Sequence, residues 1–135
     1  MRVAVCVDEE YGMLFGGRRQ SKDRLLRAQL LGAAGEGSLW MNAYSAKQFE
    51  EEPAIRVAED FLEQAEPADL CFVENTDLAP YAGKIRQLIV YRWNRRYPAT
   101  AWFPVALFEN RWKLESSTDF PGSSHDVITQ EIYSL

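Results

Sequence analysis

Leu88-Ile89-Val90-Tyr91-Arg92-Trp93 is the run of sequence that decides the fold. Apolar, β-branched and aromatic residues fill most of this run, which is typical of a strand. Further strand-like runs follow with no convincing helix between them, so we expect strands over residues 85–93, 101–105, 111–116 and 127–133. Strands that follow one another without helices commonly pair antiparallel. The sequence therefore predicts partly antiparallel closing strands at one edge of a sheet.

The first half of the chain alternates strands with helices. Residues 2–7 are an almost continuous apolar run, which predicts a first strand buried on both faces and ending at Asp8. Gly12, Gly16 and Gly17 indicate a loop after this strand. Further short strands are expected over residues 39–41, 54–58 and 69–73.

Three helices are expected between these strands. Ser21 can cap a helix whose apolar residues lie on one side and which Gly32 ends. Ser45 and Gln48 form a Ser-x-x-Gln capping box, which predicts a short helix through residues 49–52, ended by a proline. Residues 59–65 predict one or two further helical turns. Together these elements predict a single α/β domain over residues 1–135, with a mixed, mainly parallel sheet flanked by helices.

Composition and charge exclude several classes of protein. The chain has 135 residues, 47% of them hydrophobic, which is enough for one core. Twenty acidic against fifteen basic residues give a net charge of −5, which repels phosphate backbones and disfavours nucleic acid as a partner. Cys6 and Cys71 lie in apolar runs without metal-ligand spacing, so no metal site is expected. The sequence contains no signal-peptide pattern and no run of transmembrane length, so we expect a cytoplasmic protein without a membrane partner.

The order of these elements resembles the dihydrofolate reductase family. Residues 3–13 resemble the first strand of that family and the glycine-bearing loop after it, and residues 39–45 resemble its second strand and the start of its nucleotide-side helix. The runs 88–93, 101–104, 112–114 and 132–133 resemble its closing strands. The resemblance implies a shortened dihydrofolate reductase fold.

The chain departs from this family where the resemblance puts the NADPH site. The family's Gly-Gly pair, which lets the backbone approach the pyrophosphate, corresponds to residues 72–77, where Glu74 and Asp77 would face that anion with like charge. The family's Gly-Arg-Lys-Thr motif corresponds to residues 42–45, which keep a hydroxyl but lack the glycine and the arginine. Bare backbone amides at that helix start could still bind phosphate. We expect no cofactor and a loss of NADPH-dependent reduction, with a divergent reductase as an alternative.

Asp23 is the candidate for a catalytic residue. It stands near the position where the resemblance implies the acidic residue that binds the pterin ring. A carboxylate there can hold a heterocyclic amidine through two charge-assisted hydrogen bonds. The same carboxylate can instead stabilise the positive amino end of its own helix.

Polar side chains that end strands, lie in the first loop or begin a helix form the predicted ligand site. They are Asp8, Arg18, Arg19, Asp23, Asn42, Ser45, Glu74 and Asn75. If the three strands are parallel neighbours, their carboxyl ends meet at the edge of the sheet where ligands of open α/β sheets bind. The predicted partner is a small molecule, although turn geometry alone also favours Asp and Asn at the ends of strands.

Residues 91–97 suggest an alternative function. Three arginines are interleaved with three aromatic residues, a combination that binds single-stranded RNA by charge and stacking and could also bind another protein. In a strand, alternation would instead place Tyr91, Trp93 and Arg95 on one face and Arg92, Asn94 and Arg96 on the opposite face. A core face backed by a solvated basic face explains the same pattern.

Residues 122–126, Gly-Ser-Ser-His-Asp, hold the side chains of a hydrolase close together in sequence. Sequence neighbours rarely have the geometry that a nucleophile and its base require, so a loop before the last strand is the stronger interpretation. The opening and the ending of the chain also resemble small bacterial proteins, some of them labelled ribonuclease Z. That enzyme needs a metal centre with several histidines, and His125 is the one histidine of this sequence, so we do not expect ribonuclease activity.

Overall fold

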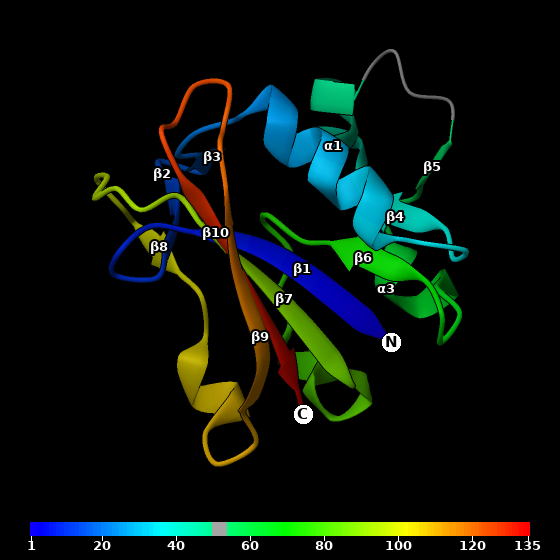
Figure 1. The fold of residues 1–135 in the computed structure, drawn as a ribbon. Coiled ribbons are helices and arrows are strands. Elements are labelled where there is room, and N and C mark those ends of the chain that lie inside the picture. The colour runs from blue at the N-terminus through cyan, green and yellow to red at the C-terminus, as the bar shows by residue number, and fades with distance from the viewer. Residues whose placement is uncertain (50–53) are drawn as a thin grey trace.

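A seven-stranded sheet forms the centre of the computed structural model, which describes residues 1–49 and 54–135 (Figure 1). In spatial order its strands are β5 (Ile55–Val57), β4 (Leu39–Met41), β6 (Leu70–Phe72), β1 (Arg2–Val7), β7 (Gln87–Arg92), β10 (Ile128–Ser134) and β9 (Lys113–Phe120). The first five are parallel, and β10 is antiparallel to both β7 and β9. This order confirms the predicted mixed, mainly parallel sheet with antiparallel closing strands.

β1 lies in the middle of the sheet and is buried on both faces, as its apolar run predicts. Its valines pack on one face with α3 (Phe61–Gln64), whereas Ala4 and Cys6 pack on the other face with α1 (Arg24–Ala33). Figure 1 shows α1 lying across that second face. Because side chains alternate between the faces of a strand, a strand covered on both faces needs apolar residues throughout.

α1 begins at a different cap from the one predicted. Asp23 is the N-cap, with an extended backbone (φ −154°, ψ 130°), and its carboxylate accepts hydrogen bonds from the amides of Leu25 and Leu26. The predicted cap at Ser21 is therefore wrong, because aspartate is an equally good cap and stands closer to the free amides. Gly32, expected to end the helix, lies inside it.

α2 (Ala43–Ala46) and the 3-10 turn η1 (Lys47–Phe49) follow β4. Asn42 caps α2 and accepts a hydrogen bond from the amide of Ser45. Ser45 thus lies inside the helix, and the predicted capping box is wrong because Asn42, three positions earlier, makes the cap. The rest of that predicted helix, residues 50–53 with its terminal proline, lies outside the described residues. No helix in the described part of the chain is long and apolar enough to cross a membrane.

Residues 12–17, predicted as a loop, instead form a hairpin. β2 (Gly12–Phe15) pairs antiparallel with β3 (Arg18–Arg19), and β8 (Ala101–Trp102) pairs with the other side of β2. The two glycines of the turn have φ angles of 58° and 78°, which a side chain would strain. This small sheet stands at the carboxyl end of β1, at the opposite end of the molecule from the chain termini (Figure 1).

The closing strands differ from the prediction at their ends. β8 stops at Trp102, because Pro104 has no N–H for a ladder, and the 3-10 turn η3 (Val105–Phe108) follows. A further 3-10 turn, η2 (Ala79–Lys84), precedes β7. β9 extends to Phe120 although nearly all of its residues are exposed, since an edge strand can be polar along its length.

Candidate functional site

The carboxyl ends of β4 and β6 meet through two asparagines. The Asn42 side-chain amide donates a hydrogen bond to the Asn75 side-chain oxygen at 2.8 Å. β4 and β6 are parallel neighbours, so the polar residues that follow them lie at the same edge of the sheet. Asn42 is fixed further by its role as the cap of α2. The two asparagines therefore join the ends of these strands.

Glu74, which follows β6, is the centre of a hydrogen-bonded network at this edge. Its Oε1 accepts from Ser45 Oγ at 2.7 Å and from Gln48 Nε2 at 3.1 Å. Arg19 binds both oxygens, with Nε 2.9 Å from Oε2 and Nη2 3.1 Å from Oε1. The side chain of Glu74 is 9% exposed, so the network contains a largely buried, bidentate ion pair. We call Arg19, Ser45, Gln48 and Glu74 the Glu74 network.

Arg19 reaches this network from β3. Its guanidinium lies 4.3 Å from the centroid of the Tyr44 ring and donates to the Tyr44 carbonyl oxygen. Burial would lower the pKa of Arg19, but the hydrogen bonds and the charge of Glu74 outweigh burial and raise it. The hairpin of β2 and β3 is thus attached to α2 by charged and aromatic contacts, and the protein's own side chains fill this part of the edge.

Asp8 and Arg18 have other surroundings. Asp8 is buried, and its carboxylate accepts from the amides of Gly12 at 2.7 Å and Glu10 at 2.8 Å. Burial would raise the pKa of Asp8, but these hydrogen bonds, with one from Gln20, lower it below its usual range. Arg18 is exposed on β3. Asp8 therefore stabilises the turn from β1 into β2.

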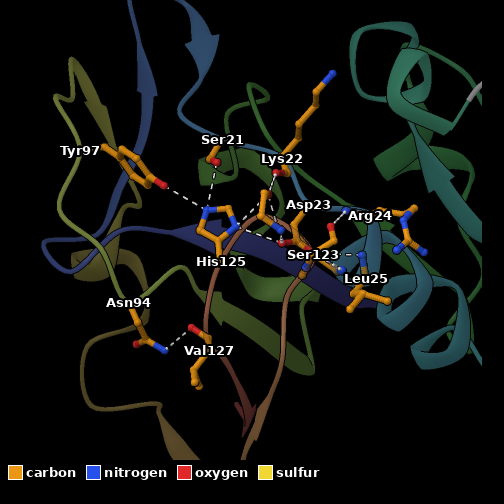
Figure 2. A network of polar contacts seen from close by, with 12 residues as sticks. Ser21, Lys22, Asp23, Arg24, Leu25, Asn94, Tyr97, Ser123, His125 and Val127 are labelled. Carbon is orange, nitrogen blue, oxygen red and sulfur yellow. Dashed lines mark hydrogen bonds and ion pairs between the residues drawn. The ribbon is translucent and has the colours of Figure 1, made fainter.

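Asp23 is bound from two directions by its own chain (Figure 2). Besides capping α1, its carboxylate accepts from the amides of Ser123 at 3.0 Å and Ser124 at 2.8 Å. His125 Nδ1 lies 3.0 Å from Asp23 Oδ2. Ser123, Ser124 and His125 belong to the loop between β9 and β10. Asp23 therefore joins α1 to a loop 100 positions later in the sequence. We call Asp23, Ser123, Ser124 and His125 the Asp23 clamp.

His125 is the buried part of this clamp. It is 4% exposed, and its ring stacks on Trp93 with centroids 4.5 Å apart and planes 21° apart. Its Nε2 lies 3.0 Å from both Ser21 Oγ and the Tyr97 hydroxyl. Because an ionised carboxylate only accepts hydrogen bonds, Nδ1 donates to Asp23. On the other side of the ring, Nε2 lies within hydrogen-bonding distance of both hydroxyls.

Ser21, His125 and Asp23 are hydrogen-bonded in the order of a hydrolase triad, but their surroundings do not suit a hydrolase. The cavity that Ser21 lines has a volume of about 10 Å³, which holds at most one water molecule. A reacting ester or amide needs space within about 3 Å of the nucleophile. The contacts of His125 with Ser21, Asp23 and Tyr97 therefore hold the β9–β10 loop in place.

The Asp23 clamp predicts a loss of stability in acid. Burial would raise the pKa of Asp23, but hydrogen bonds from Ser123, Ser124, His125 and Leu26 outweigh burial and hold it well below 3.8. A carboxyl whose pKa is depressed by folding stabilises the protein above its unfolded pKa, and this contribution is lost as the pH falls below that value. We expect the urea concentration at the unfolding midpoint to decrease as the pH is lowered below ~4. The decrease should be smaller in Asp23→Asn. Circular dichroism measures both. If the midpoints of the two proteins decrease equally at low pH, the Asp23 carboxylate does not have this role.

The basic-aromatic run over residues 91–97 is not an exposed strip. Tyr91 and Trp93 are buried in the core. Arg92 pairs with Glu131 and donates to the Tyr11 hydroxyl. Buried rings cannot stack on bases, so Tyr91 and Trp93 cannot serve the predicted interface, whereas Arg95 and Arg96 are exposed and Tyr97 is partly exposed.

An open cleft lies beside the Glu74 network, between the small sheet and the loop after β6. It has a volume of about 310 Å³ and is lined by apolar residues such as Met13 and Trp102 and by polar residues that include Glu74, Asn75 and Asp77. A larger groove of about 760 Å³ lies between α1 and the closing strands, but its lining contains none of the predicted site residues. The smaller cleft adjoins the carboxyl end of β6. Another cleft, of about 390 Å³, adjoins the carboxyl end of β1 and is lined by Asp8 and Arg96.

The comparison with solved structures identifies the architecture. The chain matches dihydrofolate reductase from Enterococcus faecalis, solved with NADP(H) and RAB-propyl, at a TM-score of 0.67 over 98% of this chain and 94% of that chain. This chain has the dihydrofolate reductase fold. The two sequences are 10% identical, so the likeness concerns the fold alone. No protein-family model matches the sequence, and no curated protein matches it.

On this dihydrofolate reductase fold, the predicted site residues separate into two groups. Five of them come together at the ends of β4 and β6, namely Arg19, Asn42, Ser45, Glu74 and Asn75. The other three, Asp8, Arg18 and Asp23, lie outside this group. Within the described residues, no group of three or more His, Cys, Asp or Glu side chains could hold a metal ion.

Several residues that contact the predicted site residues or line the cleft were not predicted from the sequence. Gln48 binds Glu74, and its position one helical turn from Ser45 was a usable signal. The Tyr44 ring contacts the Arg19 guanidinium and Trp102 lines the cleft, but no local pattern in the sequence indicates either contact. His125 was predicted in a loop, and its pairing with Asp23 has no local signal.

Proposed function

We propose that this chain binds a small molecule and does not catalyse NADPH-dependent reduction. The observation that carries the proposal is the Glu74 network. Glu74 follows β6, where the resemblance puts the glycine pair that approaches the pyrophosphate. The carboxylate takes the space of that glycine pair, and its partners Arg19, Ser45 and Gln48 are already hydrogen-bonded to it and so are not free to bind phosphate.

The amino end of α2 supports the same proposal. Bare amides at a helix start can bind phosphate. Here the amide of Ala43 donates to a Glu59 carboxylate oxygen at 3.0 Å, and the amide of Ser45 donates to Asn42. A phosphate group would have to displace both the carboxylate and the cap.

The Asp23 carboxylate likewise has no free acceptor site for the pterin ring that the resemblance implies. A carboxylate offers about four lone-pair sites. The first amides of α1 and the other members of the Asp23 clamp use those of Asp23. Binding a pterin amidine would require Asp23 to release the cap of α1 or the β9–β10 loop.

The open cleft supports a binding function. Ligand sites usually have volumes of roughly 300–1,000 Å³ and combine apolar walls with a few polar groups. The cleft, at about 310 Å³, meets this description near the lower limit, which suits a small molecule. It also adjoins the carboxyl ends of parallel strands, where ligands of this class of sheet bind.

NADPH turnover by the purified protein is the first test. We expect no oxidation of NADPH in the presence of dihydrofolate, and no rise in melting temperature with NADPH or NADP⁺, because a ligand that binds only the folded state raises this temperature. A dihydrofolate reductase of known activity is the positive control. Turnover that follows this protein through a further purification step would contradict the proposal.

A further inference from the structure

We propose that the cleft beside the Glu74 network binds an organic cation that carries a flat apolar group, with Asp77 as its counter-charge and Trp102 as its ring platform. This inference rests on the proposed small-ligand function and adds the chemical class of the ligand. Shape, charge and aromatic exposure of the cleft each contribute to it.

The shape of the cleft suits one ring with a short substituent. Its volume is about 310 Å³. Met13 and Leu14 of β2 and Pro104 after β8 form apolar walls, and the loop after β6 forms the polar side. A flat apolar group can therefore lie against the small sheet while a polar group faces the loop.

The charge of the cleft is negative. Its lining includes the carboxylates of Glu74 and Asp77, and no Lys, Arg or His is among the described residues that line it. Glu74 is neutralised by Arg19. Asp77 is exposed, accepts one hydrogen bond from the amide of Ala79 at 2.9 Å, and forms no salt bridge within the described part of the chain. Asp77 is thus the carboxylate left to attract a ligand.

Trp102 supplies the aromatic surface. It is 55% exposed, although tryptophan is highly buried on average. A cation over the face of a tryptophan is attracted by the ring quadrupole, and tryptophan is the best side chain for this contact. An exposed tryptophan and a free carboxylate in one apolar cleft favour a cationic ligand over a neutral one. The same charges repel phosphates and carboxylates.

The experiment compares three probes that share a benzyl or phenyl ring and differ in charge. Benzyltrimethylammonium, benzyl alcohol and benzoate are titrated into the protein by isothermal calorimetry. We expect the cation to bind about tenfold more tightly than the alcohol, and benzoate to bind more weakly than either.

Two variants and a control connect binding to the cleft. Asp77→Asn keeps an oxygen for the Ala79 amide and removes the charge, so it should weaken binding of the cation about fivefold and leave the alcohol unchanged. Trp102→Leu should weaken binding of both probes. Glu36→Gln removes an exposed carboxylate outside the cleft and should change neither.

Several results would overturn the inference. These are equal affinity for the cation and the alcohol, cation binding that is unchanged in Asp77→Asn, or no binding of the cation. If the alcohol binds as tightly as the cation and Trp102→Leu weakens it, the cleft is a ligand site without charge selection, and the proposed small-ligand function stands. NADPH turnover would overturn that proposed function whatever the probes show.

Discussion

Replacing Asp23 with alanine is expected to lower the free energy of unfolding by about 3–5 kcal/mol. The change removes the N-cap of α1, which alone contributes about 1 kcal/mol. It also leaves the amides of Ser123 and Ser124 and the His125 ring without their acceptor. A buried donor without a partner costs about 1–3 kcal/mol. Urea unfolding followed by circular dichroism measures the loss.

Asp126→Ala is the matched control for this variant. Asp126 is an exposed carboxylate in the same loop, so its removal should change the free energy of unfolding by less than about 0.5 kcal/mol. If Asp23→Ala is no less stable than Asp126→Ala, the clamp does not hold the loop. Unfolding followed by tryptophan fluorescence adds a local signal, since Trp93 stacks on His125.

Replacing Glu74 with alanine is expected to lower the free energy of unfolding by about 2–3 kcal/mol. Arg19 would lose the carboxylate that binds it twice, and its side chain is only 21% exposed. Ser45 and Gln48 would lose their acceptor as well. Because Arg19 can turn partly toward water, the expected loss is below that of a fully buried pair.

Two further variants separate the charge of Glu74 from its hydrogen bonds. Glu74→Gln keeps an oxygen that can accept from Ser45, so its loss of stability should be smaller than that of Glu74→Ala. Glu36→Ala removes an exposed carboxylate elsewhere and should have little effect. Equal stability of Glu74→Ala and Glu36→Ala would show that the Glu74 network does not support the fold.

The strands were predictable where burial left a pattern in the sequence. β1 and β7 are covered on both faces, so their apolar runs predicted them closely. β9 carries polar residues over most of its length and pairs on one side, so its true end at Phe120 had no apolar signal. The hairpin of β2 and β3 was missed for a related reason, because three glycines in this stretch indicate a turn more strongly than they indicate short strands.

Helix caps show why local rules did not suffice. Ser21 and Asp23 are both good caps, as are Asn42 and Ser45. The sequence cannot choose between such neighbours, because the choice depends on which residue has an extended backbone once the chain packs. In the structure the choice left Ser21 free to bind His125 and Ser45 free to bind Glu74.

The candidate site was predictable where strand order determined it. Asn42 and Asn75 were expected to meet if β4 and β6 were parallel neighbours, and they do. Asp8 was grouped with them by the same rule, but its carboxylate binds the amides of its own turn. Asp23 contacts residues that are 100 or more positions away, and contacts over such a separation produce no local pattern from which they could be predicted.

The place of β10 between β7 and β9 determines when the sheet can be completed during synthesis. Within the described residues β9 pairs with β10 alone, and β10 is synthesised after it. A chain emerging from the ribosome at about 5–20 residues per second therefore exposes β9 before its neighbour exists. The loop that binds Asp23 also emerges late, so α1 begins folding with its cap but without the rest of the clamp. β7 also lacks its partner on this side until β10 has been synthesised, and an unpaired strand edge is a site where other chains can pair.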